Sequence, residues 1–110
     1  MEKLENYRKS VNELLDRYGS QPSEDDVEIQ VIRDTENDHY QIFHVGWLNN
    51  RRIYGCIFHI DIKNEKIWIQ HDGTEIGTAV ELAELGIPKE DIVLGFHAPY
   101  KRPFTGFGTG

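Results

Sequence analysis

Residues 39–62, HYQIFHVGWLNNRRIYGCIFHIDI, decide the fold, because stretches of alternating apolar and polar residues flank the pair Asn49-Asn50. Two adjacent asparagines readily adopt the positive φ angles of a tight hairpin turn. We therefore predict two antiparallel strands, residues 39–48 and 51–62, joined by a two-residue turn. Counting outward from that turn pairs Val45 with Tyr54, Phe43 with Cys56, and Gln41 with Phe58.

Two further strands are predicted, one on each side of this hairpin. Residues 27–33 alternate in the same way and lead into the turn-rich residues 34–38, while residues 66–71 follow a turn centred on Asn64-Glu65. The pattern predicts a four-stranded antiparallel meander with one apolar face. The second turn pairs Ile62 with Ile67 and Ile60 with Ile69.

The alternation also predicts which side chains share a face of the sheet. The apolar face must be covered by helices, and Cys56 is expected to pack there as a small apolar thiol. Aromatics among polar groups on the other, mixed face are typical of a binding surface; the alternative is a surface layer partly covered by the C-terminal segment. The mixed face gathers Tyr40, Ile42, His44, Gly55, Ile57, His59, Asp61, Trp68 and Gln70.

Two helices are predicted outside the hairpins. In residues 2–18 apolar side chains recur at spacings of three and four, and Gly19 follows, where a helix often ends. Residues 78–81, TAVE, fit the capping box that begins a second helix, with a competing start at Asp72. The predicted fold class is α+β: a four-stranded antiparallel meander sheet with an N-terminal helix and a second helix packed on one face, and an extended C-terminal tail. Residues 1–110 are expected to form a single domain.

The composition argues against several classes of function. The 110 residues are 38% hydrophobic, enough for one compact domain with a core. With 12 Lys+Arg, 19 Asp+Glu and a net charge of -7, the chain lacks the clustered cations of a free-standing nucleic-acid or membrane-surface binder. The single cysteine excludes an intramolecular disulfide and a cysteine-based zinc site, which favours a cytoplasmic protein.

The spacing of histidines and carboxylates does not predict a catalytic site. His59 and Asp61 share a face of one strand, and with His44 they offer acceptable metal ligands. However, the predicted register separates the two histidines by roughly 7–8 Å or more. We therefore predict neither a metal nor a cofactor. The alternative function is a metal-assisted hydrolase acting on nucleic acid or a phosphorylated small molecule, which would use His44, His59, Asp61 and His71.

The C-terminal residues have an unusual composition for a tail. Aromatic residues recur every three or four positions from Phe96 to Phe107, and two prolines stiffen the chain. We predict an interaction element that promotes self-association; the alternative is that Phe104 and Phe107 fold back onto the mixed face around Trp68 and Tyr40. The candidate partner-interface residues are Tyr40, His44, His59, Asp61, Trp68, Tyr100, Arg102, Phe104, Thr105, Gly106 and Phe107.

A set of specific short stretches covers nearly the whole chain: residues 46–47 (GW), 52–56 (RIYGC), 59–62 (HIDI), 66–70 (KIWIQ), 72–75 (DGTE), 86–96 (GIPKEDIVLGF) and 105–107 (TGF). Together they resemble the XisI-like family, the fdxN-element excision controlling factors of cyanobacteria. The resemblance implies a small α+β fold with an antiparallel sheet, and it supplies no catalytic residue to carry over.

The function that the resemblance implies is regulatory. Founding members of the family look like accessory factors for programmed, site-specific excision of a DNA element during heterocyst differentiation, acting beside a separate recombinase. Family genes commonly neighbour a XisH-like gene, whose product resembles nuclease-fold proteins. We therefore expect a non-enzymatic factor that binds a XisH-like protein, forms a homo-oligomer, contacts nucleic acid only through its partner, and does not contact a membrane.

Overall fold

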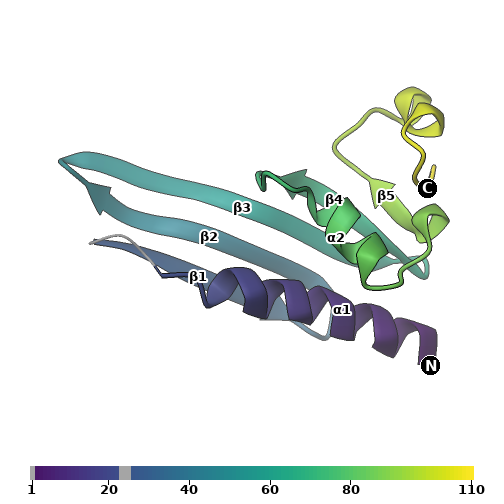
Figure 1. The fold of residues 1–110 in the computed structure, drawn as a ribbon, viewed down its shortest axis with the longest axis horizontal. Helices are drawn as coiled ribbons and strands as arrows, with labels where there is room; N and C mark the ends of the chain where they lie inside the picture. Colours follow the sequence, from purple (N-terminus) through teal and green to yellow (C-terminus); the bar gives the residue numbers. More distant parts are fainter. Residues whose placement is uncertain (1, 23–25) are drawn as a thin grey trace.

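The computed structural model describes residues 2–22 and 26–110, and it is of the α+β class (Figure 1). Both predicted helices are present. In the described part of the chain, no helix is long and apolar enough to cross a membrane. In chain order the elements are α1 (Glu2–Gly19), β1 (Asp26–Asp34), β2 (His39–Leu48), β3 (Arg51–Lys63), β4 (Lys66–Asp72), α2 (Thr78–Glu84), the 3-10 helix η1 (Lys89–Asp91), β5 (Ile92–Leu94) and the 3-10 helix η2 (Pro99–Phe104).

The sheet has five strands in the order β1-β2-β3-β4-β5, so the prediction of four strands was wrong. The three pairings among β1 to β4 are antiparallel, as predicted. β5 lies parallel to β4, with Ile67 opposite Ile92 and Ile69 opposite Leu94. A parallel neighbour needs a crossover connection, which α2 and η1 provide. The edge strands are therefore β1 and β5.

Both tight turns form as predicted. Asn49 and Asn50 have φ angles of 49° and 67°, and Asn64 and Glu65 have 53° and 60°. These positive φ values match the twist of the flanking strands. Four predicted pairs next to these turns are confirmed: Val45 with Tyr54, Phe43 with Cys56, Ile62 with Ile67, and Ile60 with Ile69.

A β-bulge in β3 changes the register halfway along the hairpin. Phe43 faces Cys56, but its neighbour Ile42 faces Phe58, so Ile57 is the extra residue of the bulge. One residue beyond this point, Gln41 faces His59, and the predicted pair of Gln41 with Phe58 is wrong. An extra residue turns every side chain beyond it to the other face of the sheet.

The bulge corrects the predicted faces. Tyr40 and Ile42, which were expected on the mixed face, are fully buried in the core with Phe58. Conversely, the side chains near the turn that were expected in the core point to the face opposite to the helices. Tyr54, one of them, is 68% exposed there. Cys56 shares that face and is half-buried, so its predicted place on the core face was also wrong. The residues that point away from the core in this way are Phe43, Val45, Tyr54 and Cys56.

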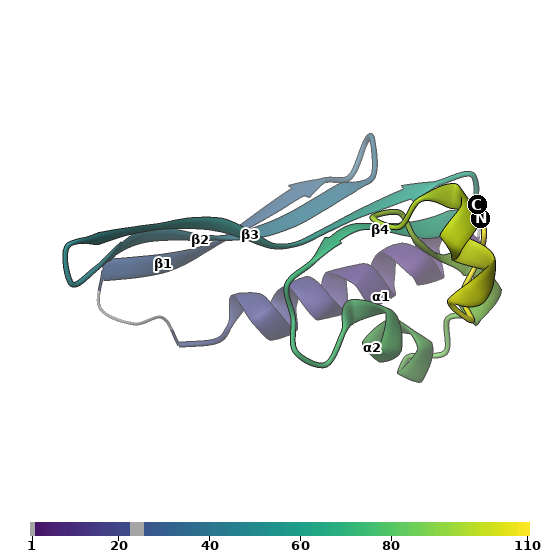
Figure 2. The same cartoon turned by 90° about the horizontal axis from the view of Figure 1, so that it is seen from above.

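Both helices cover the same face of the sheet (Figure 2). α1 contributes Val11, Leu14 and Leu15 to the core, in agreement with its predicted apolar stripe. The start of α2 differs from the predicted capping box. The carboxylate of Asp72 accepts from the backbone N–H of Thr78 at 2.8 Å, in the manner of a capping residue.

Glu81, the other half of the predicted capping box, binds α1 instead. Its carboxylate is buried and accepts from Tyr18 Oη at 2.5 Å and from Arg17 at 2.9 Å. A buried carboxylate requires such hydrogen-bonding partners. Glu81 therefore joins α2 to α1 and does not cap its own helix.

The C-terminal residues fold back onto their own sheet, and the prediction of an extended tail was wrong. The backbone N–H of Gly108 donates to the carbonyl of Ile92 at 2.7 Å, and Phe107 packs against the core. Of the two aromatics expected to fold back together, only Phe107 does so, since Phe104 is 88% exposed. Tyr40 lies away from this segment, in the core beneath α1.

Candidate functional site

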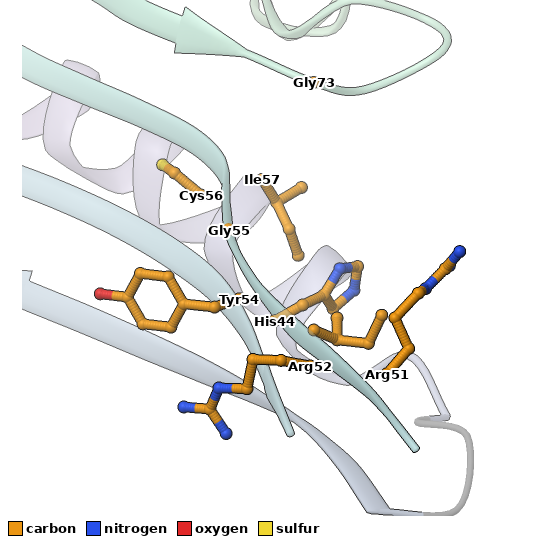
Figure 3. Close-up of a pocket in the computed structure, with 9 residues that line it drawn as sticks. His44, Arg51, Arg52, Tyr54, Gly55, Cys56, Ile57 and Gly73 are labelled. Atoms are coloured by element: carbon orange, nitrogen blue, oxygen red, sulfur yellow. The ribbon is translucent and has the colours of Figure 1, made fainter. Parts of the chain in front are cut away.

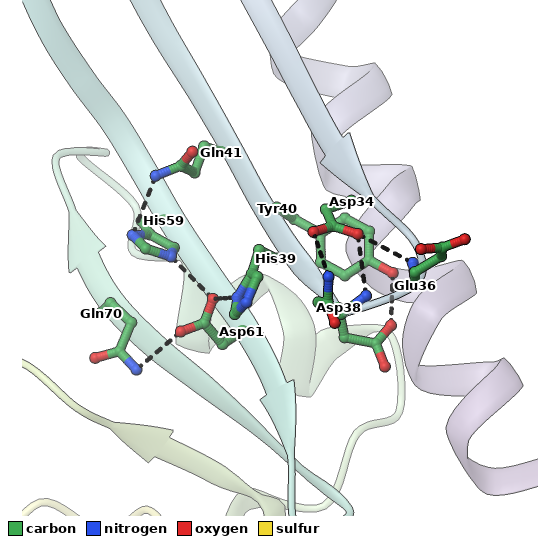
Figure 4. Close-up of polar contacts among 10 residues, drawn as sticks. Asp34, Glu36, Asp38, His39, Tyr40, Gln41, His59, Asp61 and Gln70 are labelled. Atoms are coloured by element: carbon green, nitrogen blue, oxygen red, sulfur yellow. Dashed lines mark hydrogen bonds and ion pairs between the residues drawn. The ribbon is translucent and has the colours of Figure 1, made fainter.

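The candidate site lies on the outer face, which we define as the face of the sheet opposite to α1 and α2. His39 on β2 faces Asp61 on β3, and Gln41 faces His59. Residues two apart on a strand point to the same side, so these four side chains meet on one face (Figure 4). Gln70 joins them from β4, where it is the extra residue of a second bulge. We call these five residues the His-Asp cluster.

Asp61 is the centre of the His-Asp cluster. Its Oδ1 lies 2.7 Å from His39 Nδ1 and 2.9 Å from His59 Nε2, and its Oδ2 accepts from Gln70 Nε2 at 3.2 Å. Gln41 Nε2 lies 3.4 Å from the remaining ring nitrogen of His59. The side chain of Asp61 is 14% exposed, whereas that of His39 is 54% exposed. A shielded carboxylate is thus covered by a side chain that is itself half-exposed to solvent.

The surroundings of Asp61 keep it ionised. Burial by itself raises the pKa of this carboxyl, but the hydrogen bonds from His39 and His59 outweigh burial and hold the pKa below its usual range. The same hydrogen bond to Asp61 raises the pKa of His39. The cluster therefore offers one negative oxygen flanked by two imidazoles, which suits a cation or a hydrogen-bond donor.

Of the three metal ligands considered from the sequence, the structure brings His59 and Asp61 together. The third residue beside them is His39 and not His44. His59 and Asp61 are joined by His39, and one ligand atom from each lies within 4.8 Å of the others. Within the described ranges, His44 and His71 stay outside this group. His44 lies beyond the bulge, opposite Gly55, and lines a hollow with Arg51 and other residues (Figure 3).

Sequence reasoning missed His39 because a regular hairpin places it opposite Ile60, on the core face. The bulge shifts it by one residue, to Asp61. A signal of the bulge is present in the sequence: the adjacent apolar pairs Ile42-Phe43 and Ile57-Phe58 mark where the apolar phase changes along each strand. Leaving one residue of the second strand unpaired at this point would have placed His39 opposite Asp61.

The other interface candidates divide into docked and exposed residues. Trp68 lies on the outer face between two cations, 4.3 Å from Lys63 Nζ and 5.3 Å from the guanidinium of Arg102. Arg102 also donates to the carbonyl of His97 at 3.1 Å. At the other end of the molecule, Arg52 stands opposite Trp47 on the neighbouring strand, and its guanidinium lies 5.5 Å from the centre of the Trp47 ring.

The residues after η2 form a turn that returns the chain to β5. Thr105 Oγ1 donates to the carbonyl of Arg102 at 2.9 Å and accepts from the N–H of Phe107 at 3.1 Å. Gly106 has a φ angle of 83°, which favours glycine. Tyr100 and Phe104 on η2 project into solvent, 72% and 88% exposed. We call these two residues the η2 aromatics.

Comparison with known proteins identifies relatives of the whole chain. The family model described as XisI protein matches residues 1–109. A XisI-like protein from Anabaena variabilis ATCC 29413 is 49% identical, with a TM-score of 0.91 over 97% of this chain and 99% of that chain. The fdxN element excision controlling factor XisI from the same organism is 36% identical, with a TM-score of 0.83 over 98% of this chain and 99% of that chain. None of the curated proteins matches. The chain belongs to the XisI family.

Proposed function

We propose that this protein is a non-enzymatic accessory factor that helps to control the site-specific excision of a DNA element. The observation that carries the proposal is the similarity to the fdxN element excision controlling factor XisI, at 36% identity over 98% of the chain. A likeness of this extent spans nearly the whole of both chains. Fold alone does not fix function, so the role needs a direct test.

The proposed mode of action is binding to a XisH-like protein of nuclease-like fold. The chain has a net charge of -7, which disfavours direct contact with DNA phosphates. An acidic protein is instead complementary to the basic surface of a nucleic-acid-binding partner, and such complementarity speeds encounter. DNA would then be contacted only through the partner.

We assign the partner contact to the η2 aromatics. Tyr100 and Phe104 are large and exposed, and the short helix that carries them is fixed to the body by the turn at Thr105 and by the contact of Gly108 with Ile92. Aromatic side chains on a rigid support lose little entropy on binding and are common at the centres of interfaces. The same residues would also drive the self-association expected of the isolated protein.

The test is co-expression of the chain with the XisH-like protein encoded in the same genome. We expect the two to co-purify, and we expect the double variant Tyr100→Ala, Phe104→Ala to bind at least tenfold more weakly, as for central aromatic anchors. The matched control is Tyr54→Ala, because Tyr54 is also an exposed aromatic but lies on the β2–β3 hairpin at the other end of the molecule (Figure 1).

Two outcomes would count against the proposal. If no complex forms at micromolar concentrations, the partner is wrong. If Tyr54→Ala weakens the complex as much as the double variant does, the contact does not lie on η2. Circular dichroism of each variant checks that the fold is retained.

A further inference from the structure

We propose that His39, His59 and Asp61 bind a Zn²⁺ ion on the outer face of the sheet, with the fourth coordination position open to solvent. Two imidazole nitrogens and one carboxylate oxygen are a ligand set that suits this ion. One such atom from each residue already lies within 4.8 Å of the other two. Three protein ligands with a free fourth position are typical of zinc sites that also bind a water or another molecule.

The backbone brings the three ligands together. His59 and Asp61 are two residues apart on β3, so they point to the same side, and His39 stands directly opposite Asp61 on β2. Two strands of a sheet fix the Cβ positions of all three residues. The site is therefore set by the strand pairing and by the bulge at Ile57, and does not depend on a mobile loop.

Only a small rearrangement is needed to admit the ion. His39 Nδ1 and His59 Nε2 lie 2.7 Å and 2.9 Å from the same oxygen of Asp61. Tetrahedral zinc with ligand bonds of about 2.0–2.1 Å places its ligand atoms about 3.3 Å apart. Each imidazole must therefore retreat from this oxygen by about half an ångström. The two imidazole nitrogens, which lie within 4.8 Å of each other, must settle at a similar separation of about 3.3 Å. The side chain of His39 is 54% exposed, so there is room on its solvent side for this movement.

A second layer of side chains orients the ligands. Gln41 lies at the His59 ring nitrogen that points away from Asp61, and Gln70 donates to Oδ2 of Asp61. In the structure the amide nitrogen of Gln41 faces that ring nitrogen. Binding of the ion requires the Gln41 amide to turn over, so that its oxygen accepts from Nδ1–H and Nε2 of His59 is left for the metal. Gln70 likewise occupies Oδ2 and leaves Oδ1 for the ion. Zinc-binding histidines and carboxylates commonly have such partners.

The site is open to ions from solution. The three ligands line a surface hollow together with Ile32, Asp34 and Gln41. Asp34 adds a second carboxylate to the wall of this hollow, which favours the approach of a cation. The inference rests on side-chain geometry alone, so it would hold even if the excision role were disproved.

The test is titration of the full chain, stripped of metal with a chelator, with ZnCl₂ in an isothermal calorimeter. We expect one ion per chain with a dissociation constant on the order of 1 µM or lower. His39→Ala and His59→Ala should each weaken binding at least tenfold. Gln41→Ala, which removes a positioning residue, should weaken it by roughly tenfold.

His44→Ala is the matched control, because His44 lies on the same strand as His39 but faces the other side of the sheet, beyond the bulge. It should bind zinc like the unmodified protein. X-ray absorption of the zinc-loaded protein should show two histidines and a carboxylate around the ion.

The proposal is overturned if the unmodified chain binds no stoichiometric zinc. It is equally overturned if His44→Ala weakens binding as much as His39→Ala does, because the ion would then be held by scattered surface histidines. A variant that loses its circular dichroism spectrum is replaced by His39→Asn or His59→Asn, which keeps a polar side chain of similar size.

Discussion

A single carboxylate, that of Asp38, links the N-terminal helix to the first hairpin. It accepts from Arg8 on α1 through both of its oxygens, at 2.8 Å and 2.9 Å, and from Tyr40 Oη at 2.8 Å. The hydrogen bonds from Arg8 hold the pKa of Asp38 below its usual range. Burial and the hydrogen bond to Asp38 raise the pKa of Tyr40 to about 12. Stability at this point should therefore depend on pH.

We expect Asp38→Asn to lower the free energy of unfolding at pH 7, because the charged acceptor is lost. A carboxyl whose pKa is lowered by folding stabilises the protein above the unfolded pKa of about 3.9, and this contribution is lost as the pH falls through the folded pKa. The gap between the two proteins, measured by urea unfolding, should therefore narrow as the pH is lowered below about 4. A constant gap would contradict this, and Glu84→Gln on the exposed side of α2 is the control.

Phe58 marks the point where the core meets the bulge. It is fully buried, and its ring makes an edge contact with Tyr18 of α1, with centroids 5.6 Å apart. Phe58→Ala should cost about 3–5 kcal/mol in unfolding free energy, because truncation leaves a cavity. Tyr54→Ala on the same strand should change the free energy by no more than about 0.5 kcal/mol. Similar costs for the two variants would show that Phe58 is not part of the core.

At the scale of whole elements, the β2–β3 hairpin shows what the sequence could predict. Its turn follows from Asn49-Asn50, and the pairs next to the turn follow from counting. The choice of the core face does not follow, because the apolar residues near the turn, such as Phe43, alternate as well as Tyr40 and Ile42 do. Alternation alone cannot choose between these two sets. The choice depends on which set α1 covers, and that is a tertiary contact.

The same reason limits prediction of the candidate site. The neighbours His59 and Asp61 were identified from their spacing on one strand, but His39 depends on the register across two strands. β5 was missed for another reason: a buried parallel strand shows no alternation, and residues 92–94 are too few to show a pattern of their own. Local sequence patterns therefore predict α1 and the turns, while pairing between distant strands decides the register and the fifth strand.

Deletion of Ile57 tests the bulge as an element. Without the extra residue, the hairpin would pair regularly along its whole length. Either the core residues around Ile42 or the outward-facing residues around Phe43 would then point to the wrong face. We expect a loss of cooperative urea unfolding and of the near-ultraviolet circular dichroism signal. Deletion of Thr35 in the exposed turn between β1 and β2 is the control and should cost much less. Equal effects would argue against a register fixed by Ile57.

Gly108 tests the docking of the C-terminal segment. A Cβ at this position would lie 2.4 Å from the carbonyl oxygen of Glu90, so no side chain fits without displacing the backbone. Gly108→Val should therefore lift the segment from β5 and remove Arg102 from the ring of Trp68. The expected readouts are a red shift of tryptophan emission and faster proteolysis after η2. Thr109→Ala, at an exposed neighbour, should leave both unchanged.

The charge of the whole molecule determines how it meets DNA. With a net charge of -7 it should not bind a short fluorescent duplex at about 150 mM salt, because too few phosphates would be neutralised. Fluorescence anisotropy should rise only after the XisH-like protein is added, and that rise should weaken steeply with added salt. Tight, salt-dependent binding by the chain alone would contradict both this prediction and the proposed indirect contact.

The parallel pairing of β5 with β4 has a consequence for synthesis on the ribosome. β4 emerges first, followed by α2, and only then by the short strand that pairs with it. Until that moment β4 presents a row of open hydrogen-bonding groups, to which a strand of another nascent chain can add. Arrival of β5 therefore ends a period of vulnerability to aggregation.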